Sequence, residues 1–273
     1  LDWILIVPFG MGVDGAAIAT VISQALSGLL CTWWFFSKTA KGHGLSFTKN
    51  KLRLSSHHCK KLAYIGLPMG FEYSVSAIGA VIMQDAINLL GSTAVAAQTA
   101  GEKIRQMFTL PMESVGMAMA TYAGQNVGAK KLDRIRDGLK AASMIGIAYS
   151  LIAFVILFFG GKYIALLFMD AGQTEIIGRV ATFLAANSMF YIPLTFVNVV
   201  RFTIQGMGFS TFAILAGVCE MAARSLVGFC LVPVFGFLPA CFASPLAWIF
   251  ADAFLLPAFF HCLKKLKILF GEN

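Results

Sequence analysis

The sequence predicts an all-α fold, a polytopic membrane helix bundle with about seven transmembrane helices. Three observations support this class. Apolar residues make up 58% of the chain and charged residues only 12%, with a mean hydropathy of +0.79, whereas soluble domains carry about 25% charged residues. Apolar segments of about 20 residues or more recur along the chain, and each is long enough to cross a hydrocarbon core about 30 Å thick. Basic residues gather in alternate connecting segments, as expected of membrane topology.

Seven helices are predicted from the apolar segments and the turn residues between them. In chain order, they are expected at residues 13–37, 63–90, 94–128, 138–160, 175–205, 209–232 and 240–263.

The first predicted helix follows a glycine pattern, Gly10 to Gly15, that matches G-x-G-x-x-G. A dinucleotide site needs a strand before this pattern and an acidic residue about 20 residues after it. Here the position 20 residues beyond Gly15 is Phe35, within a long apolar run. The glycines are therefore expected to allow a tight turn and close helix packing.

Proline and short turns shape the middle of the chain. Only residues 91–93 separate two predicted helices, which are therefore expected to form an antiparallel pair. Pro111 frees a backbone carbonyl inside the second of them and permits a kink. Pro193 lies in the middle of the helix predicted at 175–205, and a turn is expected at 233–239.

The basic residues predict the orientation in the membrane. The segments 38–62, 125–137 and 264–267 contain fourteen Lys and Arg residues, whereas the intervening segments contain only Lys162. This asymmetry places the basic segments and the C-terminus in the cytoplasm and residue 1 outside. The net charge of +8 is explained by this placement, so no nucleic-acid partner is expected.

A polar stripe runs along the helix predicted at 94–128. Its residues recur at spacings of three and four and thus share one helical face: Gln98, Glu102, Arg105, Thr109 and Glu113. Polar side chains inside a membrane usually face a bundle interior or a water-filled cavity. We expect these residues to line a substrate cavity. A long amphipathic helix of a soluble protein is the alternative that the composition disfavours.

Further charges lie within predicted spans. Glu220 and Arg224 are four residues apart and are expected to pair, either as a link between helices or as part of the transport pathway. As part of that pathway, both are expected to line the substrate cavity. Glu72 is expected to line the cavity, and Glu72 or Asp252 to bind a cation or exchange a proton, because such a step needs a carboxylate that can be neutralised. Asp85 and Arg201 lie near predicted helix ends, where such side chains can reach the membrane interface, and both are therefore given less weight as site residues.

Metal and enzyme sites are not expected. His57, His58 and Cys59 are adjacent, and adjacent residues rarely converge on one ion. The six cysteines form no close pair and are expected to be small buried apolar residues. The sequence contains neither H-E-x-x-H nor G-x-S-x-G, so hydrolase chemistry is not indicated. Neither a cofactor nor a metal is predicted.

Four short motifs resemble the multidrug and toxic compound extrusion (MATE) transporters. The sequence Gly-Leu-Pro-Met-Gly occupies residues 66–70, and Gly-Gln-Asn-Val-Gly-Ala occupies residues 124–129. Residues 12–20 and the Gln-Gly-Met-Gly turn at 205–208 are similar to the same family. The resemblance covers the whole chain and is greatest to the DinF-like branch.

The resemblance implies two six-helix lobes, of which this chain holds mainly the second. Residues 1–37 correspond to the end of the N-terminal lobe, 38–62 to a basic cytoplasmic linker, 63–263 to the six-helix C-terminal lobe and 264–273 to a cytoplasmic tail. By this correspondence, the sequence lacks most of the N-terminal lobe. That lobe is then a partner that transport requires. The implied function is cation-coupled (Na⁺ or H⁺) antiport that exports drugs or other cationic and amphipathic small molecules across the cell membrane.

Two alternatives stay open. A lipid-linked saccharide flippase of the same superfamily predicts a strongly cationic groove, which the mixed charges disfavour. A truncated remnant without transport activity is the other alternative. In the DinF-like branch the cation-binding acids are attributed to the N-terminal lobe, so the coupling roles of Glu72 and Asp252 remain hypotheses.

Overall fold

The computed structural model describes residues 1–36, 55–169 and 172–271, all as helices and their connections. The chain divides into two units, Leu1–Lys60 and Lys61–Asn273. Most of the predicted basic linker 38–62 lies outside the described residues.

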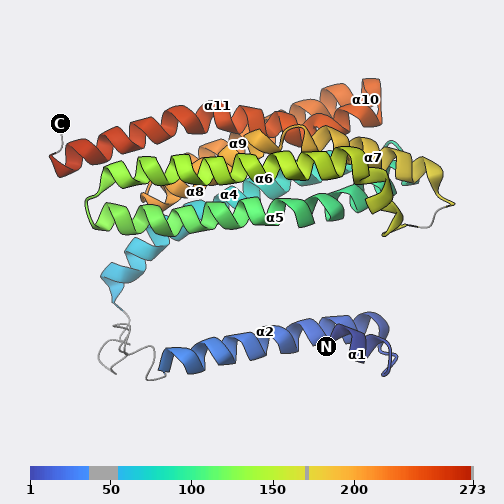
Figure 1. The fold of residues 1–273 in the computed structure, drawn as a ribbon, viewed down its shortest axis with the longest axis horizontal. Helices are drawn as coiled ribbons and strands as arrows, with labels where there is room; N and C mark the ends of the chain where they lie inside the picture. The colour runs from blue at the N-terminus through green and yellow to red at the C-terminus, as the bar shows by residue number, and fades with distance from the viewer. Residues whose placement is uncertain (37–54, 170–171, 272–273) are drawn as a thin grey trace. The chain divides into compact units, whose positions relative to one another are not determined.

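The first unit contains helix α1 (Asp2–Ile6) and helix α2 (Gly12–Phe36) (Figure 1). Gly10 and Gly12, at the turn between the helices, have φ angles of +62° and +53°, a region that glycine enters without steric cost. A Cβ atom on Gly15 would lie 2.9 Å from the Met11 Cβ and 3.2 Å from the backbone of Leu5. The glycine pattern thus forms a tight turn with close packing, as predicted.

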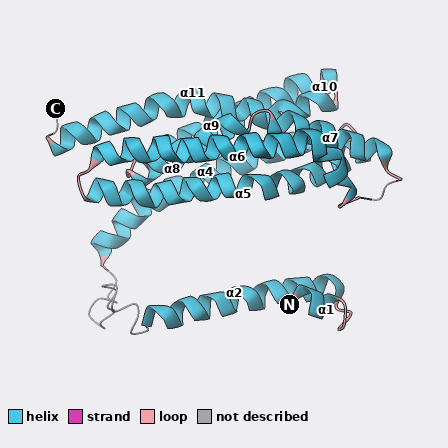
Figure 2. Ribbon diagram, in the orientation of Figure 1, coloured by secondary structure: helices cyan, strands magenta, loops and turns pink. Residues whose placement is uncertain are grey.

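The second unit is a bundle of long helices that run beside one another (Figures 1 and 2). Its elements are α4 (Ser56–Asn88), α5 (Ser92–Gly128), α6 (Leu132–Leu166), α7 (Thr174–Ser188), α8 (Tyr191–Gly206), α9 (Ser210–Leu226), the π-helix η2 (Val227–Leu231), α10 (Val232–Phe235) and α11 (Phe237–Phe270). Four of the predicted spans correspond to α4, α5, α6 and α11, the span predicted at 175–205 is divided into α7 and α8, and the span predicted at 209–232 contains α9 and η2.

Five described helices are long and apolar enough to cross a membrane, and the bent pair α7–α8 makes up to six. Helix α5 is not among them, although its 37 residues extend over about 55 Å at 1.5 Å per residue. The polar stripe lowers its mean hydropathy. Helix α5 is nevertheless long enough to span a membrane and lies within the bundle. We therefore regard it as a further transmembrane helix, in agreement with the predicted membrane bundle.

The helix predicted at 175–205 is broken, and the prediction of one continuous element is wrong. Helices α7 and α8 meet at an angle of 54°, with the break at Met189 and Phe190. Pro193 explains this position, because proline cannot donate to the carbonyl four residues earlier and its ring collides with it. That carbonyl belongs to Met189.

The other predicted boundaries shift by several residues. Helix α4 begins at Ser56 and α6 at Leu132, so both start earlier than predicted. Helix α11 continues to Phe270, which places the three C-terminal lysines on helical turns. Pro239 lies in the first turn of α11, where a missing N–H is tolerated. The turn predicted at 233–239 is therefore shorter and consists of Gly236 alone, with a φ angle of +72°.

The core of the bundle lies between α5, α6, α7, α8 and α11. Its largest fully buried side chains include Ile104, Met112, Phe183, Tyr191 and Phe259. Helices α5 and α8 pack closely at Gly206, where an added Cβ atom would collide with the backbone of Ala120. Small residues at helix contacts permit such close packing in membranes.

The outward face of α6 is apolar and exposed. Ile145, Ile152 and Phe159, spaced seven residues apart, are 61%, 59% and 71% exposed. A lipid-facing helix is expected to carry such a row. The cysteines are all free, and Cys241 and Cys262 are buried as predicted, but Cys31, Cys59 and Cys230 are exposed.

Candidate functional site

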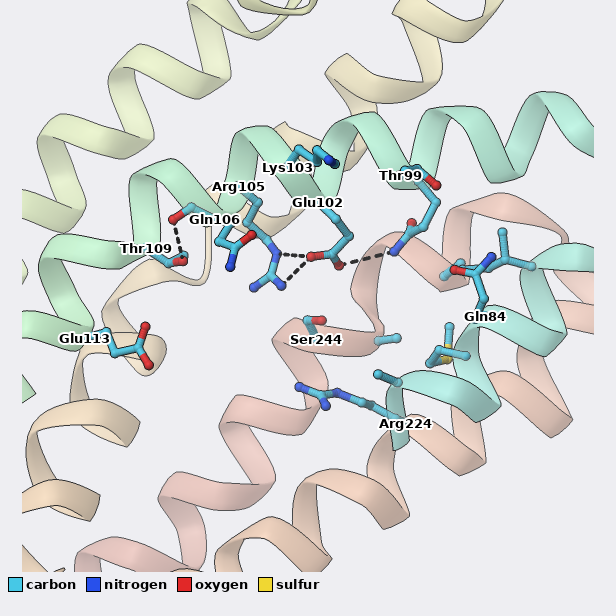
Figure 3. Close-up of a pocket in the computed structure, with 16 residues that line it drawn as sticks. Gln84, Thr99, Glu102, Lys103, Arg105, Gln106, Thr109, Glu113, Arg224 and Ser244 are labelled. Atoms are coloured by element: carbon cyan, nitrogen blue, oxygen red, sulfur yellow. Dashed lines mark hydrogen bonds and ion pairs between the residues drawn. The ribbon is translucent and has the colours of Figure 1, made fainter. Parts of the chain in front are cut away.

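The polar stripe of α5 lines a hollow of about 550 Å³, which we call the large hollow (Figure 3). All five predicted stripe residues border it: Gln98, Glu102, Arg105, Thr109 and Glu113. The helical spacing places them on one face, and the packing of the bundle turns that face toward α4, α9 and α11.

The opposite wall of the large hollow has one polar and one apolar part. Arg224 of α9, Ser244 of α11 and Gln84 of α4 contribute the polar groups. Met83 and Ile87 of α4, with small alanines of α4 and α11, contribute the apolar part. The large hollow thus combines charged groups with an apolar surface, as sites for amphipathic small molecules do.

Glu102 is neutralised within the stripe. Its carboxylate accepts hydrogen bonds from Arg105 Nε at 2.9 Å and Arg105 Nη2 at 2.5 Å, and from Gln98 Nε2 at 3.3 Å. Such a two-pronged, charge-assisted contact fixes the geometry of both side chains. The guanidinium group of Arg105 also lies over the ring of Trp248, 5.8 Å from its centre.

Glu113 is the stripe carboxylate without an ion pair among the described residues. It is partly buried and borders a second, smaller hollow of about 140 Å³ as well as the large hollow. The small hollow is also lined by Glu72, Asn198, Arg201 and Gln205. Glu113 therefore stands where the two hollows adjoin and is free to attract a cation.

Next to the small hollow, four charged side chains form a buried chain that links α4, α8 and α9. Arg201 contacts Glu72 at 3.2 Å and makes a short ion pair with Glu220. Glu220 contacts Arg224 at 3.4 Å, so the predicted pair on α9 is present. The charges alternate in sign and sum to zero.

Arg201 was not among the predicted site residues, because its position near a helix end would let its side chain reach the membrane interface. In the structure its side chain is only 13% exposed and lies between two carboxylates. Its neighbours at helical spacing, Asn198 and Gln205, also line the small hollow. The polar residues at spacings of three and four could have indicated that this face of α8 is buried in the bundle. The nearby helix end instead favoured a position at the membrane interface.

Glu72 and Glu220 lie deeper than the stripe. Glu72 is 5% exposed and accepts a hydrogen bond from Gln205 Nε2 at 2.7 Å. Glu220 is 4% exposed and lies behind Arg201 and Arg224, outside the linings of the two hollows described. The structure therefore brings Glu72 to the small hollow, whereas Glu220, which was expected to line the cavity, belongs to the ion-pair chain and lines neither hollow.

Asp252 of α11 lies apart from both hollows. Its Oδ1 atom is buried and has no hydrogen-bond partner among the described residues. Because a buried carboxylate is costly when unpaired, Asp252 differs from the well-bound Glu72.

The first turn of α4 carries His57, His58 and Cys59. Consecutive side chains on an α-helix diverge by about 100°, so these three cannot point at one ion. Over the described ranges, no three His, Cys, Asp or Glu side chains come together in a way that could hold a metal.

The family model "MatE" matches residues 68–234 of the chain. The chain is 22% identical over 167 residues to the probable multidrug resistance protein YoeA of Bacillus subtilis, covering 60% of this chain and 35% of that protein. It is 26% identical over 200 residues to the probable multidrug resistance protein YpnP of the same organism, covering 70% and 41%.

A solved multidrug resistance MATE family transporter of the MOP superfamily, in an outward-facing conformation, has a similar fold. The TM-score is 0.87 at 19% identity, over 98% of this chain and 60% of the transporter. The chain spans less than half the length of the two curated relatives. The matched model covers more than half of the chain, including α5, α8, α9 and the ion-pair residues. The chain therefore belongs to the MatE family of multidrug and toxic compound extrusion transporters.

Proposed function

We propose that this chain is the C-terminal part of an exporter that moves amphipathic cations out of the cell in exchange for Na⁺ or H⁺. The family consists of multi-pass membrane transporters rather than enzymes. The observation that carries the proposal is the large hollow, which holds charged side chains inside an otherwise apolar bundle. A charge in the centre of a bilayer costs about 2.5–3.5 kcal/mol on insertion scales, so a solvated pathway explains its presence.

Glu113 supports a cationic substrate. It has no ion pair among the described residues, and it borders both hollows. An unpaired carboxylate in partly desolvated surroundings attracts a cation more strongly than the same group does in water. The apolar side chains of Met83 and Ile87, in the same lining, offer a surface for the hydrophobic part of the substrate.

The mixed signs of the lining favour an exporter over a flippase of lipid-linked saccharides. A flippase for anionic lipid headgroups calls for a strongly cationic groove, whereas the large hollow is lined by two acidic residues, Glu102 and Glu113, beside three basic ones, Lys103, Arg105 and Arg224. The chain corresponds to 60% of the solved transporter. We therefore propose that an N-terminal lobe completes the cavity and is required for transport.

For ion coupling, Asp252 is the better candidate of the two predicted carboxylates. Glu72 is bound by Arg201 and Gln205, whereas Asp252 has an unpartnered buried oxygen. A carboxylate without a fixed partner is free to take up a proton or a sodium ion and release it again.

The basic residues support a plasma-membrane orientation with the C-terminus in the cytoplasm. Lys267 of α11 contacts Asp133 of α6 at 3.3 Å, so the basic end of α11 lies beside the start of α6. Arg134 and Arg136 lie in that same first part of α6. Basic residues therefore gather at one end of the bundle, which the positive-inside tendency assigns to the cytoplasm.

The test is an efflux measurement with ethidium in a bacterial host that lacks its own exporters. The chain is expressed within its complete reading frame, as wild type, as Glu113→Gln and as Glu175→Gln. Glu175 is the matched control because it pairs with Arg179 on an exposed face of α7. We expect the wild type and the control to lower ethidium accumulation, and Glu113→Gln to abolish most of the effect. Equal accumulation in the wild type and the empty host would refute export.

A further inference from the structure

Basic side chains from two distant parts of the chain meet where α6 begins and α11 ends. Lys267 Nζ of α11 contacts Asp133 Oδ1 of α6 at 3.3 Å. Lys130, in the turn before α6, places its Nζ 5.7 Å from the centre of the Phe270 ring of α11. Figure 1 shows the start of α6 and the end of α11 at the same end of the bundle. Two contacts therefore hold these segments together.

Further basic residues lie on the same helical faces. Arg136 and Lys140 follow Asp133 by three and seven residues on α6. Lys264 precedes Lys267 by three residues on α11. Residues at these spacings share one side of a helix. Because α6 begins here and α11 ends here, Arg136 and Lys264 both lie inward of the contact, by about 4.5 Å at 1.5 Å per residue. Five residues form what we call the basic patch: Lys130, Arg136, Lys140, Lys264 and Lys267.

The charge of the basic patch is largely uncompensated. Lys267 pairs with Asp133, whose side chain is 85% exposed. The other four basic residues form no ion pair within the described part of the chain, and all four are exposed. Asp137 is the other acidic residue in the first turns of α6. The basic patch thus presents an excess of positive charge at the surface.

Exposed apolar side chains continue both faces away from the basic patch. On α6, Met144 and Leu151 follow Lys140 by four and eleven residues and are 65% and 52% exposed. On α11, Phe260 precedes Lys264 by four residues and is 55% exposed. Each helix therefore carries positive charge near its end and apolar side chains further along the same face.

This combination fits an anionic phospholipid. Its phosphate group carries a negative charge and accepts hydrogen bonds from lysine and arginine, and a guanidinium group matches phosphate through two N–H donors. A soluble anion would leave the apolar side chains without a partner, and a zwitterionic headgroup brings a cation that the basic patch repels. Basic pockets between transmembrane helices near the cytoplasmic surface bind anionic headgroups.

We propose that the basic patch is a binding site for an anionic phospholipid of the bilayer. The phosphate lies between Arg136 and Lys264, and the acyl chains lie along the apolar side chains of α6 and α11. None of the five basic residues lines the large or the small hollow. The site is therefore distinct from the substrate cavity, and the proposal does not depend on export.

Native mass spectrometry tests the proposal on the protein expressed within its complete reading frame and purified in detergent. The probes are phosphatidylglycerol and phosphatidylcholine with the same palmitoyl and oleoyl chains, so only the headgroup differs. Dissociation constants come from titration of each lipid. We expect phosphatidylglycerol to bind at least about tenfold more tightly, because each basic residue near an anionic lipid contributes about fivefold.

Variants locate the bound lipid. Arg136→Gln and Lys264→Gln should each weaken phosphatidylglycerol binding about fivefold and leave phosphatidylcholine binding within about twofold. Lys162→Gln is the matched control, because Lys162 is exposed and lies near the other end of α6. It also forms no ion pair in the described ranges. Its affinity for phosphatidylglycerol should stay within about twofold of the wild type. Unchanged melting temperatures show that the three variants are folded.

Three results would overturn the proposal. The first is equal affinity for the two lipids. The second is an equal effect of Arg136→Gln, Lys264→Gln and Lys162→Gln, because phosphatidylglycerol would then bind elsewhere or respond to net charge alone. The third is displacement of phosphatidylglycerol by an equal concentration of glycerol phosphate, because the basic patch would then serve a soluble phosphate. Ethidium efflux tests the export proposal separately, so the failure of one proposal is distinguishable from the failure of the other.

Discussion

Arg201 should be the most sensitive charged residue of the bundle. Replacement by Gln removes the cation that lies between Glu72 and Glu220. Glu72 then keeps only the hydrogen bond from Gln205, and Glu220 keeps only Arg224 at 3.4 Å. Two carboxylates that are 7% and 5% exposed are left without adequate compensation.

The size of the effect follows from this burial. Removing one partner of a buried ion pair costs about 3–5 kcal/mol, because the remaining charge is unpaired in a poor solvent. The two pairs share Arg201, so their contributions are not additive, and we expect the same range for the whole cluster. For a chain of this size, 1 kcal/mol shifts the melting temperature by about 2–4 °C. Arg201→Gln should therefore lower it by about 6–20 °C.

The assay is thermal denaturation of the detergent-solubilised protein, followed by fluorescence-detected size exclusion. Arg179→Gln is the matched control, because its partner Glu175 is 68% exposed and such a surface pair contributes about 0.3–0.5 kcal/mol. Its melting temperature should fall by no more than about 2 °C. Adding Glu72→Gln to Arg201→Gln should restore part of the lost stability, because one unpaired carboxylate is removed.

A loss for Arg201→Gln no larger than that for Arg179→Gln would refute this reasoning. So would a double variant that is less stable than Arg201→Gln alone. Either result would mean that water reaches the two carboxylates and solvates them without help from the arginine.

Three further predictions concern packing, coupling and topology. Gly206→Ala should lower the melting temperature by several degrees, because its Cβ atom would collide with the backbone of α5, whereas Gly70→Ala, with open space around it, should not lower it. Asp252→Asn should flatten the dependence of ethidium efflux on external pH, and an unchanged profile would remove Asp252 from coupling. In a protein with Cys59 as its single cysteine, an impermeant maleimide should label inverted vesicles but not intact cells. A single cysteine introduced by Gln173→Cys should show the opposite pattern, and the reverse result for both would invert the topology.

Sequence periodicity was sufficient to predict the features that lie within one helix. The stripe from Gln98 to Glu113 and the pair Glu220–Arg224 depend only on the 3.6-residue repeat, and the structure places the stripe along one hollow and the pair in contact. The apolar segments were likewise sufficient to predict the order of the helices, because a membrane requires each span to be long, apolar and internally hydrogen-bonded.

Features that depend on contacts between helices were not predictable in the same way. Arg201 lies five residues before the end of α8, and helix position alone suggested an interfacial side chain. Its burial results from α4 and α9 closing over that turn, with contacts to residues far away in sequence. The break at Met189 and Phe190 was closer to prediction, since Pro193 was noted, but a proline acts on the carbonyl four residues earlier rather than at its own position.

The ion-pair chain also constrains how the protein is made. Glu72 enters the membrane with α4, whereas its hydrogen-bond partner Gln205 lies 133 residues further along the chain. Synthesis at about 5–20 residues per second leaves an interval of about 7–27 s before α8 emerges from the ribosome. During that interval the Glu72 carboxylate has none of its final partners from α8. Helix α4 must therefore remain in contact with the insertion machinery or with another helix until α8 is inserted.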